Sequence, residues 1–226
     1  MNKHEDYSEV GPGSEIAPNV MLGYRYPGCR QPVRIGERAK IHSGTVIYAD
    51  TVIGRRFTCG HNVLIRAECE IGDRVVVLHG STLEGRLKIG YGVKIMAHVY
   101  VPSRTVIGNM VFIGPGTTFL NARLPMREPV VKGATIGNHV MIGGGVTICP
   151  GVTIGDNVFV GAGAVVVKDI PANSLAYGNP ARAQPLPEKF GRGNDPQQVF
   201  GGTDLWDNRP DDGTWRQEFA HELQGR

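Results

Sequence analysis

Three histidines recur at an interval close to eighteen residues: His61, His79 and His98. Imidazole is the side chain that gains and loses a proton near neutral pH, so such a row could orient an acceptor molecule or relay its proton. We expect the three rings to lie near one edge of adjacent repeats if eighteen residues make one structural turn. The alternative is that they are solvent-exposed or packing histidines at turns.

A six-residue period supplies the framework for these side chains. Every sixth residue from Ile35 to Phe119 is apolar, the next residue is often glycine, and the residue four places on is often small or β-branched. A period of six is neither that of a helix nor that of simple strand alternation, and it describes a solenoid with flat parallel faces. The fifteen apolar positions are Ile35, Ile41, Ile47, Ile53, Cys59, Ile65, Ile71, Val77, Leu83, Ile89, Ile95, Val101, Ile107, Ile113 and Phe119.

The pattern resembles the hexapeptide-repeat acyltransferases, a family with the left-handed parallel β-helix fold. Three hexads then close one triangular coil of eighteen residues. The prediction is an all-β solenoid over residues 14–183, interrupted by a loop at 120–129, with a flexible N-terminus at 1–13. Residues 184–226 lack the hexad, and TWRQEFAHELQ at 214–224 predicts a short helix with an apolar stripe.

The end of the array, VFVGAGAVVVKDIPANSLAYGNPAR at 158–182, is similar to the closing segment of acetyl-CoA-dependent members. The resemblance implies acetyl-CoA as the acyl donor, with backbone contacts from small residues to the pantetheine arm. Two basic residues are the expected partners of the cofactor phosphates. The implied cofactor residues are Gly143, Gly161, Ala162, Gly163, Lys168 and Arg182.

The segment VFIGPGTTFLNARLP, residues 111–125, resembles the branch that acetylates nucleotide-linked amino sugars. That branch carries an Asn-x-x-x-Pro loop, matched by Asn121 and Pro125, and the resemblance implies that the asparagine sits beside the substrate amine. Arg123 and Leu124 depart from the acidic and aromatic residues that many members have there, which leaves the substrate open; Arg123 is kept as a candidate substrate contact. His61 is a second one.

Leu124 stands where O-acetylating relatives carry a catalytic histidine. A hydroxyl needs a positioned base, whereas an amine with a pKa near about 8 is partly neutral at pH 7 and can attack without one. We therefore predict N-acetylation of a nucleotide-linked amino sugar, with Asn121 positioning the amine and His98 or His79 relaying a proton. O-acetylation of a small hydroxyl compound is the first alternative.

Two further alternatives follow from the same fold. Some relatives are γ-type carbonic anhydrases that hold a metal with three histidines, but the His-x-x-x-x-His pair is missing here and no metal is expected. Others are non-catalytic hexapeptide-repeat proteins, against which the GAGAVVVKD and GNPAR segments argue. The family resemblance also implies a homotrimer.

Composition excludes several other classes. Twenty-four basic and twenty-one acidic residues give a net charge of +3, too balanced to predict nucleic-acid binding. No apolar run approaches the length of a membrane helix, and the first fifteen residues contain no apolar signal region. Four well-separated cysteines predict reduced thiols, so a cytoplasmic protein is expected.

Overall fold

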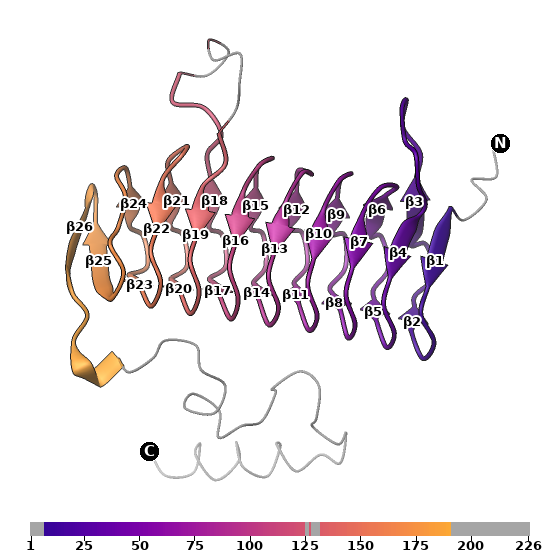
Figure 1. Cartoon of the computed structure of the whole chain (residues 1–226), viewed down its shortest axis with the longest axis horizontal. Helices are drawn as coiled ribbons and strands as arrows, with labels where there is room; N and C mark the ends of the chain where they lie inside the picture. The colour runs from indigo at the N-terminus through magenta and orange to yellow at the C-terminus, as the bar shows by residue number, and fades with distance from the viewer. Residues whose placement is uncertain (1–6, 125–126, 128–131, 191–226) are drawn as a thin grey trace, which may run out of the picture. The chain divides into compact units, whose positions relative to one another are not determined.

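A computed structural model describes residues 7–124, 127 and 132–190, which form a left-handed parallel β-helix (Figure 1). Successive short strands pass to three parallel sheets in turn, as the hexad predicted. Sheet 1 contains β1 (Ser8–Val10), β4 (Val33–Ile35), β7 (Val52–Ile53), β10 (Glu70–Ile71), β13 (Lys88–Ile89), β16 (Val106–Ile107), β19 (Thr135–Ile136) and β22 (Thr153–Ile154).

Sheet 2 contains β2 (Glu15–Ile16), β5 (Lys40–Ile41), β8 (Thr58–Cys59), β11 (Val76–Val77), β14 (Lys94–Ile95), β17 (Phe112–Ile113), β20 (Met141–Ile142), β23 (Phe159–Val160), β25 (Ser174–Gly178) and β26 (Ala181–Pro185). Sheet 3 contains β3 (Met21–Tyr24), β6 (Val46–Tyr48), β9 (Leu64–Ile65), β12 (Thr82–Leu83), β15 (Tyr100–Val101), β18 (Thr118–Phe119), β21 (Thr147–Ile148) and β24 (Val165–Val166). A single 3-10 turn, η1 (Glu188–Phe190), follows within the described residues.

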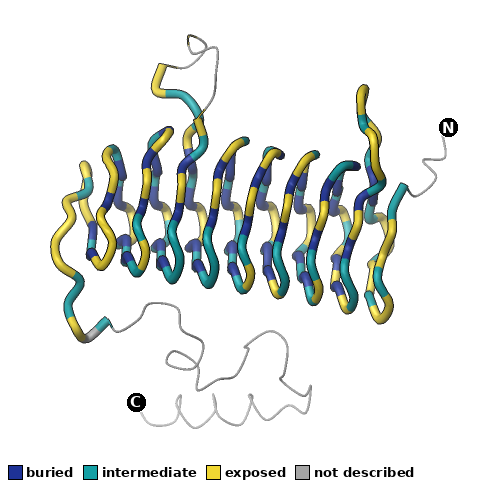
Figure 2. Tube along the Cα trace, in the orientation of Figure 1, coloured by how far each residue is buried: buried dark blue, intermediate teal, exposed yellow. Residues whose placement is uncertain are grey.

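The core is a stack of buried aliphatic residues from the strands of successive coils. Figure 2 shows buried residues recurring along the coils. Ile53, Ile71 and Ile89 occupy equivalent positions on neighbouring strands of sheet 1 and are each at most 4% exposed. Burying one such side chain stabilises the fold by about 1.5–3 kcal/mol, which explains why the aliphatic position recurs so strictly.

Two insertions break the regular register, and both emerge between sheet 3 and sheet 1 (Figure 1). Paired residues are usually eighteen positions apart, as Glu70 and Lys88 are. Val106 pairs with Thr135, 29 positions on, because the predicted loop lies between β18 and β19. Ser8 pairs with Val33, 25 positions on, because residues 25–32 form a second insertion that the sequence did not predict.

A strand lies near the N-terminus and a hairpin closes the solenoid at its other end. Residues 1–13 were expected to be flexible, yet β1 lies within them and adds a strand beside β4, since its amides and carbonyls find ladder partners there. At the other end β25 and β26 form an antiparallel hairpin. The helix predicted at 214–224 lies outside the described residues.

Candidate functional site

The turns that join sheet 2 to sheet 3 form one long edge of the solenoid, here called the histidine edge. Its first coils carry imidazole side chains and its last coils carry glycine-rich turns. The turns of this edge are residues 42–45, 60–63, 78–81, 96–99, 114–117, 143–146 and 161–164.

The three predicted histidines all lie on this edge, and their side chains are exposed. The rings of His79 and His98 meet edge to face, with centroids 5.2 Å apart and planes at 89°. A Cβ placed on Gly80 would come within 2.5 Å of His98 Nδ1, so glycine at this position lets the imidazole lie against the backbone of the coil beneath it.

Sequence reasoning missed two members of the same row. His42 lies one coil before His61, with ring centroids 4.9 Å apart, and the Ser43 hydroxyl lies 2.8 Å from His61 Nδ1. The signal was present in the spacing, because Ser43 precedes His61 by one eighteen-residue coil. The described residues therefore place four imidazoles along one edge.

The glycine-rich half of the edge presents backbone in place of side chains. Gly163 has a φ of +69°, and no atom lies within 4 Å of where its Cβ would be. Gly161 and Gly163 donate their amides along the coil stack, to Ala176 and Gly144, whereas the Ala162 amide makes no backbone hydrogen bond to the described residues. Gly143 lies one coil earlier, so all four predicted small residues share this surface. Such a surface could bind a ligand through main-chain groups.

The predicted acceptor residues lie elsewhere, on the turns that join sheet 3 to sheet 1, here called the loop edge. Asn121 is at the base of the long loop, where its carbonyl accepts a hydrogen bond of 3.1 Å from the Lys132 amide. The Arg123 guanidinium donates to the Val167 carbonyl at 3.4 Å, and the neighbouring Lys168 is exposed. Pro125 lies outside the described residues.

One chain therefore does not bring Asn121 to the histidines. The two groups occupy different edges of a triangular coil, with sheet 3 between them. Arg182 lies apart from both, exposed on β26 opposite Tyr177. Within the described residues, the histidines and the glycine-rich turns share the histidine edge, whereas Asn121, Arg123 and Lys168 lie on the loop edge.

The two buried cysteines, Cys59 and Cys69, do not supply a reactive thiolate. Burial raises the pKa of Cys59 to about 11 and that of Cys69 to about 12, so both stay protonated thiols at neutral pH. No group of three or more His, Cys, Asp or Glu side chains suited to a metal occurs in the described part of the chain. Nor does a helix long and apolar enough to span a bilayer occur there.

Comparison with known proteins finds similarity to hexapeptide-repeat transferases and to acetyltransferases. Residues 133–168 match the bacterial transferase hexapeptide model (six repeats). The chain is 37% identical over 101 residues to "Putative acetyltransferase YvoF" of Bacillus subtilis, covering 43% of this chain and 59% of that protein. It is 35% identical over 119 residues to 2,3,4,5-tetrahydropyridine-2,6-dicarboxylate N-acetyltransferase of Halalkalibacterium halodurans, covering 53% of this chain and 48% of the relative.

The match thus spans about half the length of these curated relatives. Among solved structures, UDP-N-acetylglucosamine acyltransferase from Campylobacter jejuni superposes with a TM-score of 0.68 at 18% identity, covering 80% of this chain and 71% of that one. This likeness shows the fold alone. The match to the hexapeptide model covers residues 133–168, and the chain that carries these repeats is a left-handed parallel β-helix.

Proposed function

We propose that the protein is an acetyltransferase that moves the acetyl group of acetyl-CoA to the amino group of a nucleotide-linked amino sugar. One observation carries the proposal: the histidine row runs, coil by coil, into glycine-rich turns on the same edge. Proton-exchanging side chains and an accessible main-chain surface are thus aligned along one line. The sequence similarity to acetyltransferases supports the same reaction class.

In this proposal the glycine-rich turns bind the cofactor. The pantetheine arm lies over Gly143 and Gly161–Gly163, where small residues let it approach the backbone. The Ala162 amide, which makes no backbone hydrogen bond to the described residues, donates to it. The proposed partners of the phosphates are Arg182, exposed on β26 of sheet 2, and Lys168, exposed on the loop edge of the last coil. The thioester then points toward the histidines.

The transfer itself needs a neutral amine and a place for negative charge. The nitrogen attacks the thioester carbonyl, a C–N bond forms, and a backbone N–H stabilises the oxyanion. The C–S bond then breaks, and the thiolate of coenzyme A takes up the proton that the nitrogen loses, directly or through His98 or His79. Asn121 holds the amine in line through its side-chain amide, with His61 and Arg123 as further acceptor contacts.

Because Asn121 and the histidines lie on different edges, the proposal requires a second copy of the chain. The long loop of one protomer then reaches the histidine edge of its neighbour, and a trimer closes this arrangement with cyclic symmetry. Size-exclusion chromatography with light scattering tests it. A monomer that retains full activity would contradict the shared site.

The chemical test is a panel of acceptors. Acetyl-CoA consumption is measured with UDP- and dTDP-linked amino sugars and, in parallel, with simple hydroxyl compounds. Asn121→Ala is expected to lower kcat/KM at least tenfold, which corresponds to about 1.4 kcal/mol of transition-state stabilisation. An unchanged kcat/KM would count against the role of the loop.

O-acetylation is the second candidate, and the paired rings of His79 and His98 favour it, since an imidazole could deprotonate a hydroxyl. The same panel separates the two reactions. Turnover of hydroxyl acceptors that is lost in His98→Ala or His79→Ala, with no turnover of amines, would replace the first proposal by the second.

A further inference from the structure

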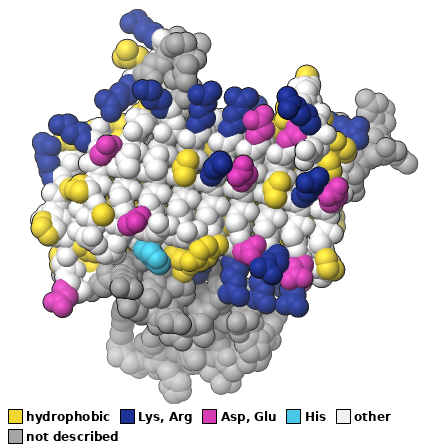
Figure 3. Space-filling view, viewed as in Figure 1, with side chains coloured by type: hydrophobic (Ala, Val, Ile, Leu, Met, Phe, Trp, Pro, Cys, Tyr) yellow, Lys and Arg dark blue, Asp and Glu magenta, His cyan; other side chains and the backbone are white. Residues whose placement is uncertain are grey.

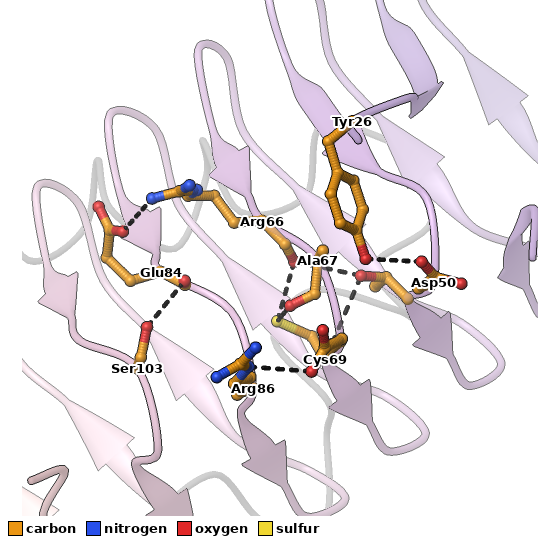
Figure 4. Close-up of polar contacts among 10 residues, drawn as sticks. Tyr26, Asp50, Arg66, Ala67, Cys69, Glu84, Arg86 and Ser103 are labelled. Carbon is orange, nitrogen blue, oxygen red and sulfur yellow. Dashed lines mark hydrogen bonds and ion pairs between the residues drawn. The ribbon is translucent and has the colours of Figure 1, made fainter. Parts of the chain in front are cut away.

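A second surface feature lies on the loop edge, between the two insertions. It is a cavity of about 300 Å³ lined by successive turns, with Tyr26 and Tyr48 at one end and Ser103 and Arg104 at the other. Figure 1 shows the insertions rising from the same edge, and Figure 4 shows the polar side chains on the turns between them. The insertions therefore bound a trough that runs along the solenoid.

The charges in this trough are paired except at one end. Arg66 donates to Glu84 at 2.8 Å, and Arg86 donates to Glu68 at 3.0 Å, each linking one coil to the next. Arg104 occupies the next coil at the same left-handed turn position, with a φ of +66°. Its guanidinium makes no hydrogen bond or ion pair with the described residues, so it leaves one uncompensated positive charge.

The other end of the trough is aromatic and rigid. The Tyr26 hydroxyl donates to Asp50 at 2.6 Å (Figure 4). Asp50 also accepts hydrogen bonds from the backbone amides of Arg30 and Gln31. Tyr48 packs beside Tyr26, with ring centroids 6.2 Å apart. These contacts fix the second insertion against the solenoid and present ring surface to the cavity.

The guanidinium of Arg66 adds a flat cation to the aromatic end. Its carbon lies 5.8 Å from the centre of the Tyr48 ring, and both side chains line the cavity. Tyrosine rings and an arginine plane together form the kind of surface on which planar bases stack. Stacking contacts of this type bind bases independently of sequence in nucleic-acid proteins.

The coil spacing sets the distance between the tyrosine end of the trough and Arg104. Asp50, Glu68, Arg86 and Arg104 occupy the same position on four consecutive coils, so Arg104 lies three coils from the tyrosine end, about 14 Å away. That length suits a molecule with a flat ring at one end and phosphate further along. Lysine and arginine side chains line this edge on the face seen in Figure 3, which makes the surroundings favourable for an anion.

We propose that this trough binds a nucleoside diphosphate, with its base on the tyrosines and its diphosphate at Arg104. The long loop begins one coil beyond Arg104, at Leu120, so a sugar attached to the second phosphate lies at the base of that loop, beside Asn121. The site thus deepens the proposed function, on which its role as acceptor site rests. It is distinct from the histidine edge, where the acyl donor is placed.

The test measures binding by isothermal titration calorimetry with UDP, dTDP, GDP, ADP and inorganic pyrophosphate. We expect at least one nucleoside diphosphate to bind more tightly than pyrophosphate. Arg104→Gln keeps the size of the side chain and is expected to weaken the nucleotide and pyrophosphate by tenfold or more. Tyr48→Leu is expected to weaken the nucleotide alone. Arg34→Ala, which removes an exposed arginine of sheet 1, is the matched control and leaves both unchanged.

Three results would overturn the site. The first is that no nucleoside diphosphate binds at millimolar concentration. The second is that Arg104→Gln and the unaltered protein bind the nucleotide with equal affinity. The third is that saturating coenzyme A displaces the bound nucleotide. The last would make the trough part of the donor site. Nucleotide binding that follows the variants without any amine turnover would leave the trough standing and refute the proposed reaction.

Discussion

Replacing Gly80 by alanine tests the histidine edge without touching a histidine. The new Cβ would lie 2.5 Å from His98 Nδ1 and 2.6 Å from its Cε1, closer than non-bonded atoms approach, so the imidazole must turn away. The φ of Gly80 is +67°, and alanine in that left-handed region costs about 1–2 kcal/mol. For a chain of this size the melting temperature should fall by about 2–8 °C.

Gly92→Ala is the matched control for this variant. Gly92 has a φ of +66°, and its added Cβ would meet the side-chain sulfur of Met110 on a different edge of the solenoid. Both variants therefore lose a similar free energy of folding through backbone strain, and each displaces one flexible side chain. Only Gly80→Ala displaces an imidazole. The loss of melting temperature should be similar in the two proteins.

The assay is acetyl-CoA consumption, followed by the release of free coenzyme A thiol with an active acceptor. We expect Gly80→Ala to lose at least tenfold in kcat/KM, about 1.4 kcal/mol, while Gly92→Ala stays near the unaltered value. If Gly80→Ala keeps full kcat/KM while its melting temperature falls as in the control, the position of the His98 ring does not matter to the reaction, and the reasoning about this edge is wrong.

Two further predictions concern groups away from the histidine edge. In the native protein Cys29 and Cys149 should react with a chromogenic disulfide reagent, whereas the buried Cys59 and Cys69 should react only on unfolding. Equal reaction rates of all four thiols in the native protein would contradict the burial described. Desolvation opposes ionisation of Asp50, but hydrogen bonds from the Tyr26 hydroxyl and two backbone amides prevail and hold its pKa below 3.8. The ionised carboxylate therefore stabilises the folded protein above pH 3.8, and this stabilisation is lost as the pH falls through the lowered pKa. The gap in melting temperature between the unaltered protein and Asp50→Asn should thus be constant from pH 7 to about 5 and shrink near pH 3, and a gap that is as wide at pH 3 as at pH 7 would rule this out.

The coils were predictable because each one needs an inward aliphatic side chain at the same place. Fifteen successive apolar positions at a spacing of six fit neither a helix nor simple strand alternation, and the sheets confirm the assignment from Ile35 to Phe119. The insertion at residues 25–32 was not predicted. It lies before Ile35, where the regular series of apolar residues begins. The hydrogen bond that holds it, from Tyr26 to Asp50, joins residues 24 positions apart, and this spacing does not recur in the sequence.

The edges could have been assigned by counting but were not. Asn121 follows a hexad apolar residue of sheet 3, Phe119, whereas His61 follows one of sheet 2, Cys59, so a count in units of eighteen places them on different edges. The charge pairs of the trough could also have been found by counting. Glu68 and Arg86, like Arg66 and Glu84, lie eighteen residues apart, whereas the residue eighteen before Arg104 is another arginine, Arg86. The aromatic end could not be found this way, because Tyr26 lies in the insertion, outside the repeat.

The most direct test of the central claim is the position of the transferred group. The protein is incubated with acetyl-CoA labelled in the acetyl carbons and a set of nucleotide-linked amino sugars, and the products are examined by mass spectrometry and NMR. We predict that label appears on the sugar nitrogen and that Asn121→Ala slows its appearance at least tenfold. Label found only on oxygen, or no label transferred to any sugar, would contradict the account.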